Sequence, residues 1–448
     1  MRSDGGGVGL GDSHAACSPS RYIPQMTWLS GDVVPEIPRD HRLDSSLAFA
    51  RNPYDFISSE CRRRGTDLFQ TRLMLRKTIG MYGKEAAELF YDPERFIRRG
   101  AMPMRIRKTL VGRGGVQGLD GDTHRHRKQM FISLVSDERV AALVAETENR
   151  WRRAAEDWTR RDRIVLYDAA RYVLSQAVCA WAGVPLAASE VHRRTEDLTA
   201  MFQDAGTIGL RHWQARAARK RAEGWTADLI VRTRTGQLSA PADSALHVIA
   251  THRDVDGRVL PPRIAAVELL NVLRPTVAVS VFITFAAVAL HQHSAYRSRV
   301  LADSSVLRMF VQEVRRFFPF FPAVAARVRE TFEWRGYRFD GGTHVMLDLH
   351  GTNHDERVWR EPDAFRPERF LQWDGSPFNF IPQGGGDHYR HHRCPGEGIA
   401  IALMESARTF LAGRLSYTVP AQDFRIDMRQ LPALPRSGVV LSSVRPAI

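Results

Sequence analysis

The sequence predicts a mainly helical protein with a small β region, folded as a single large domain. Three observations carry this prediction. Segments with apolar residues at helical spacing cover most of the chain, alternating segments are few and short, and no repeat or linker divides the chain. With 448 residues, 44% of them hydrophobic, the chain can bury a large core.

The expected elements follow from these patterns in chain order. Alternation of Phe69, Thr71 and Leu73 predicts a pair of strands, and short strands return near the C-terminus; the expected strand regions are 68–82, near 325–349 and near 414–445. Residues 101–119 are rich in Gly and Arg, lack periodicity and predict a loop. Helices are expected at 84–90, about 121–134, 137–160, 168–182, 188–204, 211–235, 262–291, 304–317 and 398–412, the last with Gly413 as its C-cap.

The two ends of the chain differ in composition. The first 20 residues are rich in Gly, Ser and Asp without an apolar core, so residues 1–24 predict a disordered tail that is neither a signal peptide nor an anchor. The longest uncharged apolar run, 275–290, is too short to span a bilayer. We therefore expect a soluble, cytoplasmic protein with no membrane span.

Charge and cysteine content exclude further classes of protein. The net charge of +14 comes almost entirely from arginine, with five lysines in the chain. Because the arginines are spread along the chain and mixed with acids, they indicate solvated helix faces and no nucleic-acid surface. The four cysteines, Cys17, Cys61, Cys179 and Cys394, are far apart, which argues against a disulfide framework and for a reducing compartment.

A glycine- and histidine-rich loop over 380–397 carries the most informative cysteine. It places Cys394 just ahead of the predicted helix 398–412, where the partial positive charge of the helix N-terminus, together with Arg393, favours a thiolate. No second cysteine stands nearby to indicate zinc or a redox dithiol. Such a thiolate suits a nucleophile or a metal ligand, and the alternative is a buried structural cysteine.

A basic helix start predicts an anion site. Asp122 is placed to cap the helix at 121–134, and His124 and Lys128 lie one above the other at i and i+4. Two cations on one helix face suit a dianion. The alternative is an ordinary solvated face.

The helix over 262–291 contains a charged residue in apolar surroundings. Pro275 kinks the helix, and Arg274 beside it needs an anionic partner because an unpaired buried charge is very costly. Glu268 is the nearest internal candidate, and an acidic ligand is the other.

Together these motifs resemble those of the cytochrome P450 superfamily. The cysteine loop resembles the loop of that family, and Glu313 with Arg316 matches its Glu-x-x-Arg pair, which the 366–369 arginine segment joins. The resemblance implies a cytochrome P450 fold over 25–448 and a heme b cofactor (iron protoporphyrin IX) whose iron has Cys394 as axial ligand. It also implies that His124 and Lys128 bind the heme propionates.

Within the superfamily, Arg274-Pro275 stands where oxygen-activating members carry an acid–alcohol pair. This pattern resembles the fatty-acid peroxygenase branch, which includes fatty-acid decarboxylases. The resemblance implies hydroxylation of fatty acids at the α or β carbon with hydrogen peroxide, no redox partner, and a substrate site formed by Arg274, Pro275 and Gln117. Arg274 and Gln117 are the expected catalytic residues. The alternatives are a monooxygenase fed by redox partners and a heme-binding sensor without turnover.

Gln117 bears on which product is expected. Glutamine cannot titrate, whereas histidine donates a proton near neutral pH. The position resembles Gln in hydroxylating members of the branch and His in strong alkene formers. We therefore expect mainly 2- or 3-hydroxy acids with a minor share of terminal alkenes from decarboxylation.

Overall fold

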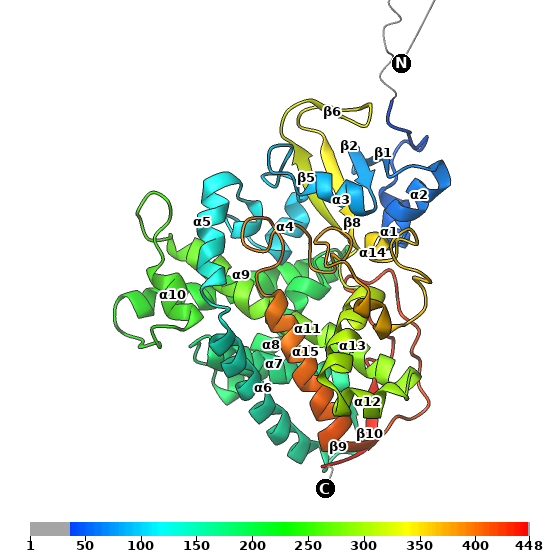
Figure 1. Cartoon of the computed structure of the whole chain (residues 1–448). Coiled ribbons are helices and arrows are strands. Elements are labelled where there is room, and N and C mark those ends of the chain that lie inside the picture. The colour runs from blue at the N-terminus through cyan, green and yellow to red at the C-terminus, as the bar shows by residue number, and fades with distance from the viewer. Residues whose placement is uncertain (1–35, 447–448) are drawn as a thin grey trace, which may run out of the picture.

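One long helix, α11 (Pro262–Gln292), runs through the middle of the molecule, and the other large helices surround it (Figure 1). The computed structural model describes residues 36–446, so the predicted tail at 1–24 lies outside the described residues. α11 is long and apolar enough to cross a membrane by length and composition, but 94% of its most apolar window is buried inside the protein. A helix that is apolar on all sides has to be buried, and here the rest of the protein buries it.

The mainly helical prediction is confirmed. The helices are α1 (Ser46–Arg51), α2 (Phe56–Arg64), α3 (Lys84–Phe90), α4 (Met104–Leu110), α5 (Gly121–Ile132), α6 (Asp137–Trp158), α7 (Leu166–Trp181), α8 (Val191–Gln203), α9 (Leu210–Arg234), α10 (Ala245–Thr251), α11, α12 (Tyr296–Ala302), α13 (Ser304–Phe317), α14 (Leu349–Asn353) and α15 (Glu397–Thr409). Every expected helix is present, with bounds shifted by a few residues. The helices that the sequence patterns missed have five to nine residues, too few for a periodic pattern to be recognised.

The β region is small, and its larger part lies at one end of the molecule, as Figure 1 shows. Its strands are β1 (Leu68–Leu73), β2 (Arg76–Met81), β3 (Phe96–Ile97), β4 (Arg163–Val165), β5 (Ala323–Val328), β6 (Phe332–Trp334), β7 (Tyr337–Phe339), β8 (His344–Asp348), β9 (Leu415–Thr418) and β10 (Val440–Pro446). The main sheet has the order β1-β2-β8-β5-β3, and β4, β10 and β9 form a second sheet at the opposite end of the helical body. The predicted strand pair at 68–82 is the hairpin β1–β2, in which Leu68 pairs with Met81.

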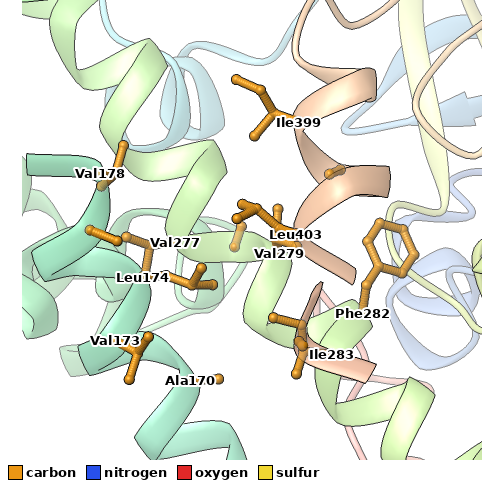
Figure 2. Close-up of a cluster of buried hydrophobic side chains, with 14 of the residues drawn as sticks. Ala170, Val173, Leu174, Val178, Val277, Val279, Phe282, Ile283, Ile399 and Leu403 are labelled. Carbon is orange, nitrogen blue, oxygen red and sulfur yellow. The ribbon is translucent and has the colours of Figure 1, made fainter. Parts of the chain in front are cut away.

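The core is formed where α7 and α15 pack against α11. Figure 2 shows Leu174 of α7 beside Val277 of α11, and Leu403 of α15 beside Val279. All four side chains are buried. Because α15 begins directly after the cysteine loop, this packing fixes the position of the loop relative to α11.

Two local predictions are wrong. The expected loop at 101–119 contains α4, a helix with one buried residue, Thr109, and hence no apolar stripe to detect. Its C-terminal carbonyls accept hydrogen bonds from arginines of α9, as Leu110 O does from Arg219 at 3.2 Å. Gly413 is not a C-cap, because α15 ends at Thr409 and a π-helical turn follows; a Cβ on Gly413 would lie 2.9 Å from the Leu301 side chain.

A buried ion-pair cluster joins α13 to the segment before the cysteine loop, as predicted. Arg316 donates two hydrogen bonds of 2.8 Å to the Glu313 carboxylate, and Arg369 donates a third at 3.1 Å. Arg316 also donates to the carbonyl of Asn353, whose side chain accepts a hydrogen bond from the backbone N–H of Ile381. The cluster therefore supports the start of the cysteine loop.

Substitution of Glu313 by Ala should strongly destabilise the fold, because it leaves two buried guanidinium groups without their carboxylate. Removal of one partner of a buried pair typically costs about 3–5 kcal/mol. Urea unfolding followed by circular dichroism measures the loss, and Glu333→Ala, at an exposed position of β6, is the control. A Glu313→Ala protein as stable as the control would contradict the role of the cluster.

Candidate active site

Cys394 lies at the end of the cysteine loop, three residues before α15, and is partly exposed to the interior. Its backbone N–H donates to the carbonyl of Gln383 at 3.1 Å, and the side-chain amide of Gln383 donates to the sulfur at 3.9 Å. The loop therefore closes on itself and presents one sulfur in a fixed orientation. A sulfur that accepts N–H bonds and is not fully buried suits a metal ligand.

The electrostatic surroundings of Cys394 differ from the expectation. Burial and the nearby carboxylate of Glu397 raise the pKa of the Cys394 thiol, and the backbone N–H of Gly396 offsets only part of this effect. The guanidinium of Arg393 does not act on the sulfur alone, since it donates to Glu397 at 2.6 Å. Helix position and Arg393 thus do not suffice to form the thiolate, whereas a coordinated metal ion deprotonates a thiol directly.

A second ion-pair cluster lies beneath the loop. Arg315 donates to the Glu397 carboxylate and, at 3.1 Å, to the side-chain oxygen of Gln383. The same glutamine donates to the Cys394 sulfur, so Arg315 determines which end of the amide faces the sulfur. The sequence did not predict that Arg315 and Gln383 act on the cysteine sulfur, because no motif in the sequence indicates this contact.

His124 and Lys128 both contact the cysteine loop. Lys128 donates to the carbonyls of His391 and Arg393, the latter at 2.9 Å, and the His124 ring stacks on His392 at 3.8 Å between centroids. Burial lowers the pKa of Lys128 to about 8, and burial together with Lys128 lowers the pKa of His124 to about 4. Of the two expected cations, only Lys128 is charged at neutral pH, and His124 is a neutral hydrogen-bonding group.

The predicted cap of this helix is wrong. The N-cap residue of α5 is Asp120, and Asp122 lies in the first turn. The Asp120 carboxylate accepts hydrogen bonds from the backbone N–H groups of Arg98 and Arg99, at 2.7 and 3.0 Å. It therefore joins the start of α5 to the segment after β3.

A polar network joins α11 to the turn that carries Gln117. The Asn271 amide donates to Gln117 Oε1 at 3.1 Å and to Glu268 Oε2 at 2.9 Å. Since the oxygen of Gln117 is bound, its NH₂ group points away from Asn271. A Cβ on Gly115 would lie 3.0 Å from the Asn271 amide, so the glycine permits the close approach of this turn to α11.

Glu268 is the centre of this network. Its Oε1 accepts from the backbone N–H of Val116 at 2.9 Å and from Arg127 at 2.8 Å, and its side chain is fully buried. Asn271 and Arg127 were missed as site residues. The spacing of Glu268, Asn271 and Arg274, three residues apart on an apolar helix, was the available signal for Asn271.

Arg274 has no such partner. Its side chain is buried, its Nε has no hydrogen-bond partner, and no carboxylate among residues 36–446 forms an ion pair with it. Burial, and the charge of Arg219, lower the pKa of Arg274 to about 9, while the Cys394 sulfur acts in the opposite direction. The internal pair with Glu268 is therefore wrong, and Arg274 and Cys394 belong to one site.

The structure thus brings Cys394, Arg274 and Gln117 to the interior between α11, α15 and the 116–118 turn, with His124 and Lys128 at the edge of the cysteine loop. Two solved structures share this architecture closely. A variant of cytochrome P450SP alpha (CYP152B1) is 51% identical, with alignments covering 90% of this chain and 100% of that chain at a TM-score of 0.89. Cytochrome P450EX alpha (CYP152N1), solved with myristic acid, is 44% identical over 92% of this chain and 100% of that chain, at a TM-score of 0.90.

This chain belongs to the cytochrome P450 family. The family profile described as Cytochrome P450 matches residues 287–433. A variant of cytochrome P450 OleT in complex with arachidonic acid is 32% identical over 92% of this chain and 99% of that one, with a TM-score of 0.89. Alignments with the first curated relatives span about a quarter of those proteins; cytochrome P450 71D18 from Mentha gracilis is 31% identical over 29% of this chain and 26% of its own length.

Cytochromes P450 carry heme, and the residues of this cytochrome P450 fit that group. The donor set at the centre is a single cysteine sulfur with one amide N–H on it, as a thiolate ligand requires. The charged Lys128 and the neutral His124 lie beside the loop, where they can bind anionic groups. The buried Nε of Arg274 has no hydrogen-bond partner within residues 36–446, and an anionic ligand could accept from it.

The cluster beneath the loop predicts acid sensitivity of this cytochrome P450. Burial alone would raise the pKa of Glu397, but Arg315 and Arg393 lower it to about 2 from 4.5. A carboxylate with a depressed pKa stabilises the fold above the unfolded pKa and loses this effect as pH falls toward the folded pKa. Between pH 5 and 2 the contribution lost is on the order of 3 kcal/mol.

Urea unfolding at several pH values tests this prediction by comparing wild type with Glu397→Gln. The difference in unfolding free energy between the two proteins should shrink as pH falls from 5 toward 2, since the carboxylate becomes neutral in the wild type. A difference that stays constant over this range would show that Glu397 does not titrate as described.

Proposed function

We propose that this cytochrome P450 is a heme-thiolate peroxygenase that uses hydrogen peroxide to hydroxylate fatty acids at the α or β carbon. The observation that carries the proposal is the buried Arg274, which has no carboxylate partner within residues 36–446. An uncompensated buried charge is costly, and a fatty-acid carboxylate would compensate it. Two related cytochromes P450 were solved with fatty acids, one with myristic acid and one with arachidonic acid, which supports the same class of substrate.

Cys394, His124 and Lys128 are the residues that would hold the cofactor, which we take to be heme b. Cys394 would coordinate the iron, and Lys128 and His124 would bind the propionates. Thiolate-ligated heme favours cleavage of an O–O bond and supplies the oxidising power of the reaction. Gln383 donates a hydrogen bond to the sulfur, and Arg315 orients the Gln383 amide. Both would therefore adjust how strongly the sulfur donates electron density to the metal.

Arg274 would hold the substrate carboxylate, so that the α and β carbons are the atoms nearest the reacting centre. In this position the carboxylate can exchange a proton with peroxide, a form of acid–base catalysis supplied by the substrate. Gln117, oriented by Asn271, would direct its NH₂ group as a donor toward substrate or water. Pro275, which cannot donate a backbone hydrogen bond, follows Arg274 in α11 and would contribute to the same substrate site.

An apolar hollow at the surface would receive the acyl chain on its way in. It has a volume of about 600 Å³ and lies between α4 and the start of α9. Its apolar lining includes Met104, Ile208 and Trp213, while Lys108 and Arg216 add positive charge. This combination suits a long-chain acid, whose tail is apolar and whose head is negative. A cytoplasmic location and the lack of a redox partner stay predictions.

Product analysis of the purified heme-loaded protein tests the proposal. Given hydrogen peroxide and a long saturated fatty acid, without any reductase, the protein should form hydroxy acids. A monooxygenase fed by redox partners would turn over only after addition of a reductase, and a heme-binding sensor would bind the acid without product. Either result would overturn the proposed function.

Arg274→Ala should abolish fatty-acid binding and peroxygenation while heme is retained. Loss of one partner of a buried, charge-assisted pair costs about 2–5 kcal/mol, or roughly 30-fold or more in affinity. Spectral titration with fatty acid measures the change, and Arg263→Ala, an exposed arginine on the same helix, is the matched control. Addition of a short carboxylic acid should restore oxidation of a substrate without a carboxylate. Wild-type affinity in Arg274→Ala would exclude this role.

Gln117 should determine the balance of products. Since glutamine cannot supply a proton, the wild type should release mainly 2- or 3-hydroxy acids, and Gln117→His should raise the share of terminal alkenes. Gas chromatography of the products measures the ratio, with Gln129→His, an exposed position on the following helix α5, as a control for an added histidine. A majority of 1-alkene from the wild type would show that Gln117 does not set the outcome.

A further inference from the structure

A second group of metal-binding side chains lies outside the active site. His126 on α5 meets His252 and Asp254, which follow α10, and one ligand atom of each residue lies within 4.8 Å of the others. Figure 1 shows α5 and α10 next to each other on one side of the molecule. Neither histidine takes part in the site described above.

We propose that His126, His252 and Asp254 bind a divalent transition-metal ion of the zinc class. Two imidazoles and one carboxylate are a ligand set typical of Zn²⁺, with a fourth position left for water. Such N/O ligands bind Zn²⁺, Ni²⁺ and Cu²⁺, whereas Mg²⁺ and Ca²⁺ prefer sites built from oxygen alone.

The unpartnered nitrogen of His252 supports this assignment independently. Its Nε2 is buried and has no hydrogen-bond partner among the described residues. A buried ring nitrogen without a partner carries a free-energy cost that a coordinated ion would remove.

The other two ligands are held in place. His126 Nε2 lies 2.8 Å from the carbonyl of Arg253, which ties its ring to the segment that carries His252 and Asp254. That segment is a tight turn, closed by hydrogen bonds of 2.9 Å from Asp254 N to Arg258 O and 2.8 Å from Gly257 N to Asp254 O. Ligand atoms around tetrahedral zinc are about 3.3 Å apart, given bonds of about 2.0–2.2 Å. Because the carbonyl of Arg253 can only accept, His126 Nε2 carries the proton of that hydrogen bond, and Nδ1 is the nitrogen of His126 left to bind an ion.

Asp254 also connects this site to the active site. Its carboxylate accepts from Arg127, which donates at 2.8 Å to Glu268, the centre of the network that holds Asn271. A carboxylate has about four lone pairs, so Asp254 can bind an ion and keep Arg127. Glu268 balances the charge of Arg127, which leaves the Asp254 charge for the ion.

Zinc binding to the full-length, heme-loaded protein tests the proposal. After removal of any affinity tag and treatment with a chelator, equilibrium dialysis should give one saturable Zn²⁺ per chain, which excess Mg²⁺ does not displace. His126→Ala and His252→Ala should each weaken this binding about tenfold or more, since loss of even an outer-sphere partner costs that much. His41→Ala, an exposed histidine outside the cluster, should bind like wild type.

A measurement on the wild type tests the same site without any substitution, so it does not depend on whether the variants fold. Zn²⁺ should protect the exposed His126 from modification by diethyl pyrocarbonate, read by mass spectrometry, while His41 stays reactive. Absence of saturable zinc binding would overturn the proposal. So would unchanged affinity in the two variants, an equal loss in His41→Ala, or no protection of His126.

Discussion

The buried carboxylate of Glu268 decides what the interior of this protein can bind. It accepts hydrogen bonds from Arg127, Asn271 and the backbone of Val116, so its charge is compensated without Arg274. Arg274 lies six residues further along the same helix. Had Glu268 paired with it, the charge of Arg274 would be compensated inside the protein. The pairing with Arg127 instead leaves Arg274 as a buried cation with no carboxylate partner within residues 36–446.

The cysteine loop depends on two further clusters of the same kind. Glu313 with Arg316 and Arg369 supports the start of the loop, and Glu397 with Arg315 and Arg393 supports its end. Both use the planar guanidinium, which can donate several hydrogen bonds in fixed directions. Among residues 36–446 eight arginines are buried, whereas the others are at least partly exposed.

Arg127 links three parts of the molecule that are far apart in sequence. It lies on α5 between His126 and Lys128, which point to different surroundings: His126 toward the turn after α10, and Lys128 toward the cysteine loop. One helical segment therefore contributes to the proposed cofactor site, to the network that orients Gln117, and to the proposed zinc site. Neighbouring residues on a helix point about 100° apart, which makes this division geometrically natural.

The sequence by itself determined the fold class, the long helices and the residues that matter most in the interior. Apolar periodicity over 15 or more residues is a local signal, and an arginine inside an apolar helix, or a cysteine in a glycine-rich loop, is visible without coordinates. The family resemblance that these motifs carry, with its fold, agrees with the solved relatives. The short helices and α4 escaped detection because they lack a periodic apolar face.

Only the tertiary structure determined which charged residues pair with each other. Sequence spacing indicated Glu268 as a partner of Arg274, but the partner of Glu268 is Arg127, 141 residues away. The sequence likewise predicted a positive charge on His124 and a thiolate at Cys394. In the structure, burial lowers the pKa of His124 and raises the pKa of Cys394. Desolvation and ion pairing depend on what packs around a group, and residues distant in the chain supply that packing.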